Sequence, residues 1–200
     1  MNSMEMMVFK GGKDIKEAVQ ATDKLGQDAG LGNKEVLRLQ LLAEELLGMM
    51  QSIAGEVEAK YRVEQEDKHF NLILDSTLDM TKEMRKTLLS VSTTGENTAA
   101  KGFMGKLRDM IYSAMLPSET GPSSMSMGLM SMGSPSAYST GENLKWSMTQ
   151  YMAEMKKTDA EEAEGAWDEL EKSITASIAD DISIRIKGSN VRITITKTFA

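Results

Sequence analysis

The residues best suited to chemistry lie in the stretch 92–111, STTGENTAAKGFMGKLRDMI, where a polar, glycine-bearing loop runs into a predicted amphipathic helix. Exposed backbone N–H groups at a helix N-terminus attract anions, so such a junction can hold phosphate. The residues that would contact a nucleotide there are Thr94, Gly95, Gly102, Gly105 and Lys106. Ordinary loop-to-helix junctions share this pattern, so the pattern alone does not establish a nucleotide site.

The two best-known phosphate-binding motifs do not fit this stretch. A P-loop needs a glycine, four residues, and then Gly-Lys-Ser/Thr. Gly105 and Lys106 are preceded at that distance by Ala100 and followed by Leu107, so both ends of the motif fail. A dinucleotide-binding fingerprint also fails, because Gly102 and Gly105 supply only part of it and no predicted strand comes directly before them.

Acidic side chains are the next candidates for catalysis. Glu44 and Glu45 are adjacent on a predicted helix, so they point about 100° apart and do not converge on one substrate. Asp75 and Asp79 flank the end of a predicted strand, where solvated charge is the simpler interpretation. His69 is the only histidine, and its place between two predicted strands favours a turn or edge residue over a catalytic base.

Composition predicts a single domain, 1–200, of an ordinary globular kind, with 40% apolar and 26% charged residues. The net charge of −7 argues against nucleic acid as a partner, because affinity for it rests on neutralising phosphates. The chain has no cysteine, which excludes thiolate metal sites, and its single histidine excludes a His-x-x-x-His metal site, so no residue is assigned as a metal ligand. No signal pattern and no long apolar run is present, so we expect a cytoplasmic protein without a membrane partner.

Periodicity predicts the elements that must position these residues. A short strand is expected at 7–10, a helix at 13–29, and a long core helix from Lys34 to about Ala54 with Asn33 as its N-cap. The segment YRVEQEDKHFNLILDS indicates two strands around a charged turn. Further helices are expected at 81–89 and 101–116.

The second half of the chain begins with a segment of different composition, 117–143. It holds all three prolines and the run SSMSMGLMSMGS, and it predicts a long flexible loop. Its function is left open between a disordered excursion, a lid, a methionine-rich contact surface and a methionine-only copper(I) site.

After this loop, a helical pattern is expected from Leu144 to Met155, and an acidic helix follows with Trp167, Leu170 and Ile174 on one side. The chain closes with a hairpin whose turn, Gly188-Ser189, suits type II′. Hairpins flanking helices without alternating βαβ units predict an α+β sandwich, with helices on one face of a mainly antiparallel sheet.

This order of elements resembles the histidine-kinase-like ATPase superfamily (the Bergerat or GHKL fold), most of all its bacterial anti-sigma-factor serine kinases. The resemblance covers about residues 34–116 and the last hairpin, and it rests on order and pattern. In that family a helix with Glu-x-x-x-Asn supplies a base and a magnesium ligand, Asp-x-Gly-x-Gly binds adenine, and Gly-x-Gly-Leu-Gly-Leu begins a phosphate-binding helix.

Carried onto this sequence, the resemblance assigns the catalytic glutamate to Glu45, but Met49 stands four residues later in place of the asparagine. A thioether cannot replace an oxygen ligand of Mg²⁺. Asp75 and Asp79 fall in the place of the adenine box, which here has no glycine, whereas Gly102 and Gly105 retain two glycines of the last box.

The resemblance therefore implies a degenerate ATPase-like regulatory protein that binds a protein partner, as anti-sigma factors do. ATP with Mg²⁺ is the cofactor of the family, and the missing ligand argues against it here. Two alternatives stay open: an active kinase or ATPase that uses Glu45 as base, and an interaction protein unrelated to ATPases. The sequence also leaves a homodimer open.

Overall fold

The computed structural model describes residues 2–8, 12–54, 59–77, 103–115, 138–140, 143–157 and 170–200. In chain order, the elements are β1 (Asn2–Val8), α1 (Gly12–Asp28), α2 (Asn33–Ala54), β2 (Ala59–Glu66), β3 (His69–Thr77), α4 (Phe103–Met115), β4 (Tyr138–Thr140), β5 (Asn143–Ser147), α6 (Met148–Met155), α8 (Ile174–Ile178), β6 (Asp181–Lys187) and β7 (Asn190–Thr198). The strands form one seven-stranded sheet in the order β1-β2-β3-β7-β6-β5-β4.

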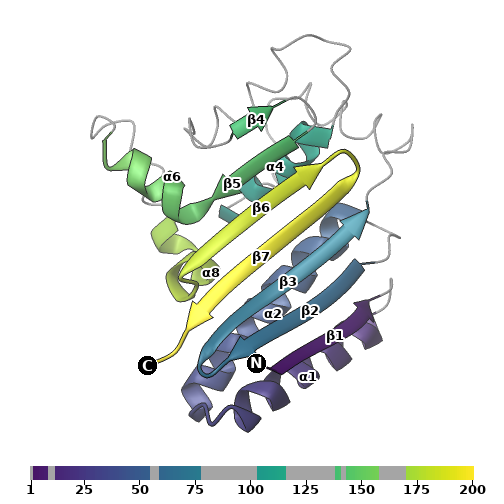
Figure 1. Cartoon of the computed structure of the whole chain (residues 1–200), viewed down its shortest axis with the longest axis vertical. Helices are drawn as coiled ribbons and strands as arrows, with labels where there is room; N and C mark the ends of the chain where they lie inside the picture. Colours follow the sequence, from purple (N-terminus) through teal and green to yellow (C-terminus); the bar gives the residue numbers. More distant parts are fainter. Residues whose placement is uncertain are drawn as a thin grey trace.

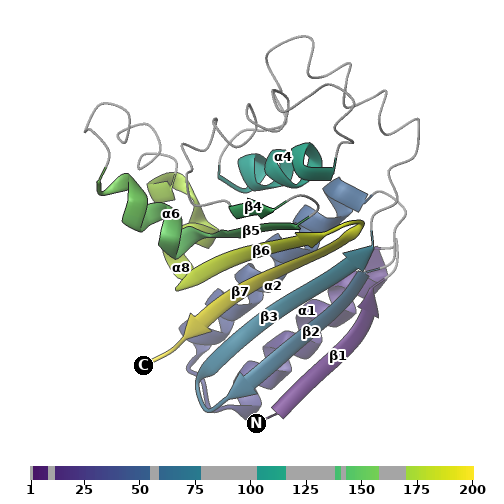
Figure 2. The same ribbon diagram turned by 45° about the horizontal axis from the view of Figure 1, so that its top comes forward.

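Every neighbouring pair of strands in this sheet is antiparallel. Helices α1 and α2 lie behind the sheet in the view of Figure 1, and α4 and α8 contact α2 on that side. The turned view of Figure 2 shows the same one-sided arrangement of α1 and α2. The predicted α+β sandwich, helices on one face of an antiparallel sheet, is therefore confirmed.

The long helix α2 anchors the core, as its apolar spacing predicts. Its buried side chains recur at three- and four-residue intervals and face the sheet; they include Leu39, Leu42, Ala43, Leu46 and Leu47. Strand residues that alternate along the chain meet them from the sheet, among them Tyr61, Val63, Phe70, Leu72 and Leu74. Phe103 of α4 reaches this core beside Trp146 of β5, with ring centroids 6.0 Å apart.

Two glycines determine where α1 ends and α2 begins. Gly30 adopts φ +76°, and the N–H of Leu31 donates to the Gly26 carbonyl at 3.1 Å, which together end α1 in a Schellman motif. The next helix is capped differently from the prediction. Gly32, and not Asn33, is the N-cap, because its carbonyl accepts the first helical bonds and its N–H donates to Glu35 Oε2 at 2.7 Å.

Both predicted hairpins are confirmed, and each has a two-residue turn. Gly188 has φ +55° between β6 and β7, as its place in the turn requires. Asp67 has φ +50° between β2 and β3, an uncommon conformation for a residue other than glycine. The Gln65 side chain donates to the Asp67 carbonyl at 2.6 Å and so supports that turn.

Three predicted boundaries were wrong. The first strand begins at Asn2 rather than at Met7, and residues 9 and 10 of the predicted strand lie outside the described residues. Within the predicted loop, residues 138–140 form β4 and Asn143 begins β5. Residues 144–147 are strand and not helix, because Leu144 and Trp146 alternate into the core and the Ser147 side chain then caps α6. The remainder of 117–143 and the predicted helix at 81–89 lie outside the described residues.

The predicted apolar side of the acidic helix is also incomplete. Leu170 is buried as expected, but the Ile174 side chain is 63% exposed. Ser173 separates the two, since it is extended and its hydroxyl caps α8 by accepting the N–H of Ala176. The helical spacing therefore breaks at Ser173, and Ile174 turns away from the core. Trp167 lies outside the described residues.

Candidate functional site

The two faces of the sheet have opposite chemistry. Side chains of the central strands that point toward α1 and α2 are buried and mostly apolar, whereas the alternate side chains point to the other side of the sheet and are mostly polar. We call this second surface the open face. Its residues on the central strands include Lys60, Arg62 and Glu64 of β2, Asn71, Ile73 and Asp75 of β3, Arg192, Thr194 and Thr196 of β7, Asp181, Ser183, Arg185 and Lys187 of β6, and Lys145 of β5.

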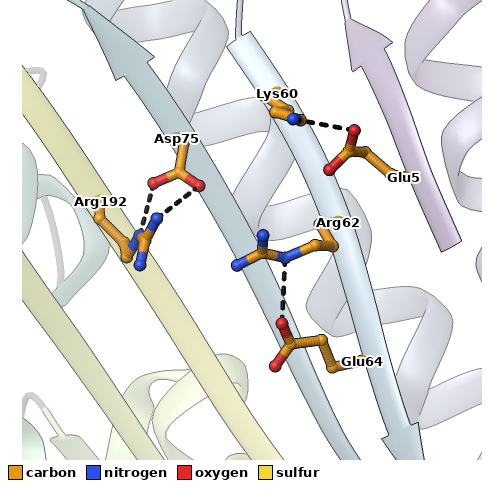
Figure 3. Close-up of polar contacts among 6 residues, drawn as sticks. All are labelled: Glu5, Lys60, Arg62, Glu64, Asp75 and Arg192. Carbon is orange, nitrogen blue, oxygen red and sulfur yellow. Dashed lines mark hydrogen bonds and ion pairs between the residues drawn. The ribbon is translucent and has the colours of Figure 1, made fainter. Parts of the chain in front are cut away.

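Ion pairs lie on the open face between and along strands (Figure 3). Arg192 clamps Asp75 across β7 and β3, with Nε 2.5 Å from Oδ1 and Nη2 3.0 Å from Oδ2. Lys60 of β2 reaches Glu5 of β1 at 2.8 Å. The forked arginine–carboxylate pair is the more specific of the two, because two parallel bonds fix its orientation.

The hydrogen bonds that Arg192 donates to the carboxylate of Asp75 raise the pKa of Arg192 above its usual value. Beside this pair, Arg62 Nε lies 3.2 Å from Glu64 Oε1 along β2, although its N–H forms no hydrogen bond. Ile73 points away from the helices and yet is only 6% exposed; in the register it lies directly between Arg62 of β2 and Thr194 of β7. The stems of long charged residues can bury an apolar neighbour in this way.

Uncharged polar pairs occupy other parts of the open face. The hydroxyl of Thr196 donates to Asn71 Oδ1 at 2.9 Å, and Thr77 donates to Asn190 Oδ1 at 2.9 Å. His69 Nδ1 lies 2.9 Å from the Thr198 hydroxyl. The only histidine is the first residue of β3, beside the turn, in agreement with the prediction of a residue at a turn or the end of a strand. These cross-strand pairs support the sheet.

The structure does not bring together Glu45 and Asp75, the two predicted catalytic and adenine-binding residues that it describes. Glu45 is exposed on α2, on the helix side of the sheet. Asp75 points to the opposite side, where Arg192 holds it. The whole sheet therefore separates the two carboxylates. Met49, at the position of the family's magnesium ligand, is 6% exposed and packs in the core.

The predicted phosphate-binding residues divide into two groups. Gly105 and Lys106 lie inside α4, past its first residue Phe103, and both are partly buried. Backbone N–H groups in the first turn of a helix are the ones available to an anion, so Gly105 is still within reach of that role. Asp79, Thr94, Gly95 and Gly102 lie outside the described residues.

No protein-family model matches this chain, and no curated protein is significantly similar to it. The chemistry must therefore be read from the geometry alone. Among the described residues, no three histidine or carboxylate side chains gather where they could bind a metal ion. Within the same ranges, no helix has both the length and the apolar character needed to cross a membrane.

The sequence did not predict the group of three neighbouring positive charges on the open face. Lys145, Arg185 and Arg192 face one another directly on β5, β6 and β7. The signal for two of them was present, because the two-residue turn at Gly188-Ser189 fixes the register and pairs Arg185 with Arg192. Lys145 could not be added, since its segment was predicted to be a helix.

Proposed function

We propose that this chain is a regulatory protein on a degenerate ATPase-like scaffold, and that it acts by binding a protein partner in the manner of an anti-sigma factor. The observation that carries this proposal is the open face, a broad polar sheet surface that no described helix covers. The cysteine-free composition supports a reducing, cytoplasmic location for it.

Two features of the described residues support a non-catalytic role. Met49 is buried in the core where the family has a metal ligand, so Mg²⁺ would have no side-chain oxygen there. Glu45 and Asp75 are held on opposite sides of the sheet, so they do not act on one substrate. Both features remove parts of the family's mechanism and leave its scaffold.

The test is a calorimetric titration with ATP and ADP, with and without Mg²⁺, together with a measurement of phosphate release and of phosphoryl transfer to protein. We expect no magnesium-dependent turnover. Any micromolar nucleotide binding that survives should weaken in Gly105→Asp, because a carboxylate beside the first turn of α4 repels phosphate. Glu45→Ala should leave nucleotide binding unchanged.

Magnesium-dependent turnover that disappears in Glu45→Ala would instead make the chain an active kinase or ATPase. Absence of binding at millimolar nucleotide would mean that the chain has no nucleotide ligand, and the proposed binding of a protein partner would be unaffected. The matched control for Gly105→Asp is Gly48→Asp, since Gly48 is exposed in the middle of α2 and has open space beside it. That control introduces the same charge on a different helix, outside the first turn of α4.

A further inference from the structure

The open face carries a cluster of cations that the fold itself does not need. Lys145, Arg185 and Arg192 occupy directly opposed positions on three neighbouring strands, and Lys187 follows Arg185 by two residues on β6. All four side chains are exposed. Because neighbouring strands lie about 4.8 Å apart, the three opposed cations fall within about 10 Å. We call these four residues the basic cluster.

This arrangement is unfavourable for the sheet by itself. Like charges placed directly opposite each other on neighbouring strands repel and destabilise the pairing. Asp75 offsets the charge of Arg192 at one end of the row. Among the described residues, no carboxylate forms an ion pair with Lys145, Arg185 or Lys187. Like charges placed opposite each other without a compensating carboxylate are expected at functional surfaces, where a ligand supplies the missing opposite charge.

The position of the cluster also runs against the charge of the chain. The net charge is −7, yet four cations gather on the β5–β6–β7 part of the open face. Two carboxylates lie near its margins: Asp75 of β3 is paired with Arg192, and Asp181 at the far end of β6 accepts hydrogen bonds from Ser147 and Thr149. The surrounding residues Ser183, Thr194 and Asn190 are neutral and polar, so they can add hydrogen bonds without adding negative charge. The local field therefore attracts an anion to this patch.

We propose that the basic cluster is the docking surface for an acidic segment of the partner protein. This inference rests on the proposed function and names the chemistry of the partner that it requires. A carboxylate of the segment lies across Arg185, whose planar guanidinium group can bind it through two hydrogen bonds. Arg192 already donates from Nε and Nη2 to Asp75, so it contributes its charge and its remaining N–H groups. Lys145 and Lys187 flank them as point charges.

An acidic protein segment fits this surface better than nucleic acid does. The phosphate backbone is a dense polyanion, and the excess of acidic groups on this chain repels it beyond the small cluster. A peptide with a few glutamates or aspartates places its charges only where the cluster can neutralise them. Carboxylates three or four residues apart on a helix lie about 5–6 Å from each other, close to the spacing of the opposed cations.

The test uses the full chain and fluorescence anisotropy of a labelled peptide in which pairs of glutamates alternate with pairs of alanines. We expect saturable binding that weakens as salt rises. Arg185→Glu should weaken it at least about tenfold, because the new carboxylate neutralises its neighbours and repels the peptide. The matched control is Arg38→Glu, an equal change of charge at an exposed position of α2, and it should alter binding less than about twofold at physiological salt.

A neutral variant, Arg185→Gln, should fall between the unchanged protein and Arg185→Glu, and it keeps the test valid where the charge reversal disturbs folding. Absence of saturable binding to the unchanged protein, or an equal loss in Arg38→Glu, would overturn the proposal. Tighter binding of a single-stranded oligonucleotide of equal charge would overturn the class of partner. Phosphoryl transfer with intact peptide binding would refute the proposed function alone, whereas absent peptide binding without phosphoryl transfer would refute only this docking surface.

Discussion

The two faces of the sheet are built from the same strands, but one face forms the apolar core and the other carries polar and charged side chains. Leu72 and Ile73 are consecutive residues of β3, yet Leu72 belongs to the main core and Ile73 lies on the open face, directly opposite Arg62. The helix side is closed by apolar packing and tolerates little change in volume. The open face is held by pairs of polar groups, which contribute less to stability than apolar packing does. Polar side chains on this face can therefore serve recognition of a partner at a small cost in stability.

The largest expected effect compares those two neighbours. Leu72→Ala should cost about 2–5 kcal/mol of unfolding free energy, because it opens a cavity between α2 and the sheet. Ile73→Ala should cost at least about 1 kcal/mol less, since Arg62 and other long side chains can relax into the space. Urea denaturation of both variants measures the difference. Equal losses would mean that the open face is packed as tightly as the core.

The next largest effect is expected at a buried hydrogen bond on the helix side of the sheet, between Thr22 and Tyr61. The Thr22 hydroxyl donates to the Ala18 carbonyl at 2.8 Å, so the Tyr61 hydroxyl, 2.9 Å away, must donate to Thr22. Tyr61→Phe removes that bond and should cost about 1 kcal/mol in neutral solution. Thermal unfolding of the variant gives the loss, and Thr22→Val tests the same bond from its other end.

Burial raises the pKa of Tyr61 well above its ordinary value, against a smaller lowering by Thr22. A raised pKa in the folded state means that the neutral form is retained there, while the unfolded chain ionises near pH 10. Stability should therefore be unaffected by Tyr61 below that pH and should fall above it, by up to about 1.4 kcal/mol per pH unit. Unfolding measured between neutral and alkaline pH should show this slope, and Tyr61→Phe should remove it.

A smaller effect, of opposite sign, is expected at the basic cluster. Arg185→Glu replaces two like-charge contacts with opposite-charge contacts to Lys145 and Arg192, so it should raise stability by about 0.2–1 kcal/mol. The same variant is the one expected to lose the acidic peptide. A gain in melting temperature together with lost binding would identify the cluster as a surface kept for recognition, and a drop in melting temperature would contradict the repulsion argument.

The smallest effect concerns the exposed pair at the edge of the sheet. Lys60 and Glu5 are 43% and 48% exposed, so water and salt screen their attraction. Glu5→Gln should change stability by less than about 0.5 kcal/mol, and that change should vanish in high salt. Denaturation at two ionic strengths gives the comparison with Asp75→Asn, where loss of the forked bonds to Arg192 should cost more.

Sequence periodicity predicted the elements whose signal is local. The apolar spacing of α2 and the alternation of β6 and β7 each lie within one segment, and the glycine at position 188 fixes their turn. The strand β5 was missed because it passes into α6 without a breaker, and Leu144, Trp146, Met148 and Tyr151 together imitate helical spacing. Short apolar runs of this kind suit either structure.

The candidate site was harder to predict because it depends on pairing between distant segments. Asp75 meets Arg192 across 117 residues of sequence, and no local pattern specifies that β3 lies beside β7. The same is true of Lys145 and Arg185. Glu45 was assigned a role from resemblance, and its exposure on the far side of the sheet from Asp75 follows from packing that the sequence pattern did not contain.

The place of β7 has a consequence for how the chain reaches its fold. β7 separates β1-β2-β3 from β6-β5-β4, so it joins two three-stranded pieces into one sheet. During synthesis the first three strands emerge long before their partner, and the edge of β3 stays unpaired until residues 190–198 have left the ribosome. Pairing over such a separation is slow, because the intervening loop must be closed before contacts form. The nascent chain therefore exposes an unpaired strand edge while residues 78–189 are being synthesised, which is the interval in which chaperones would act on it.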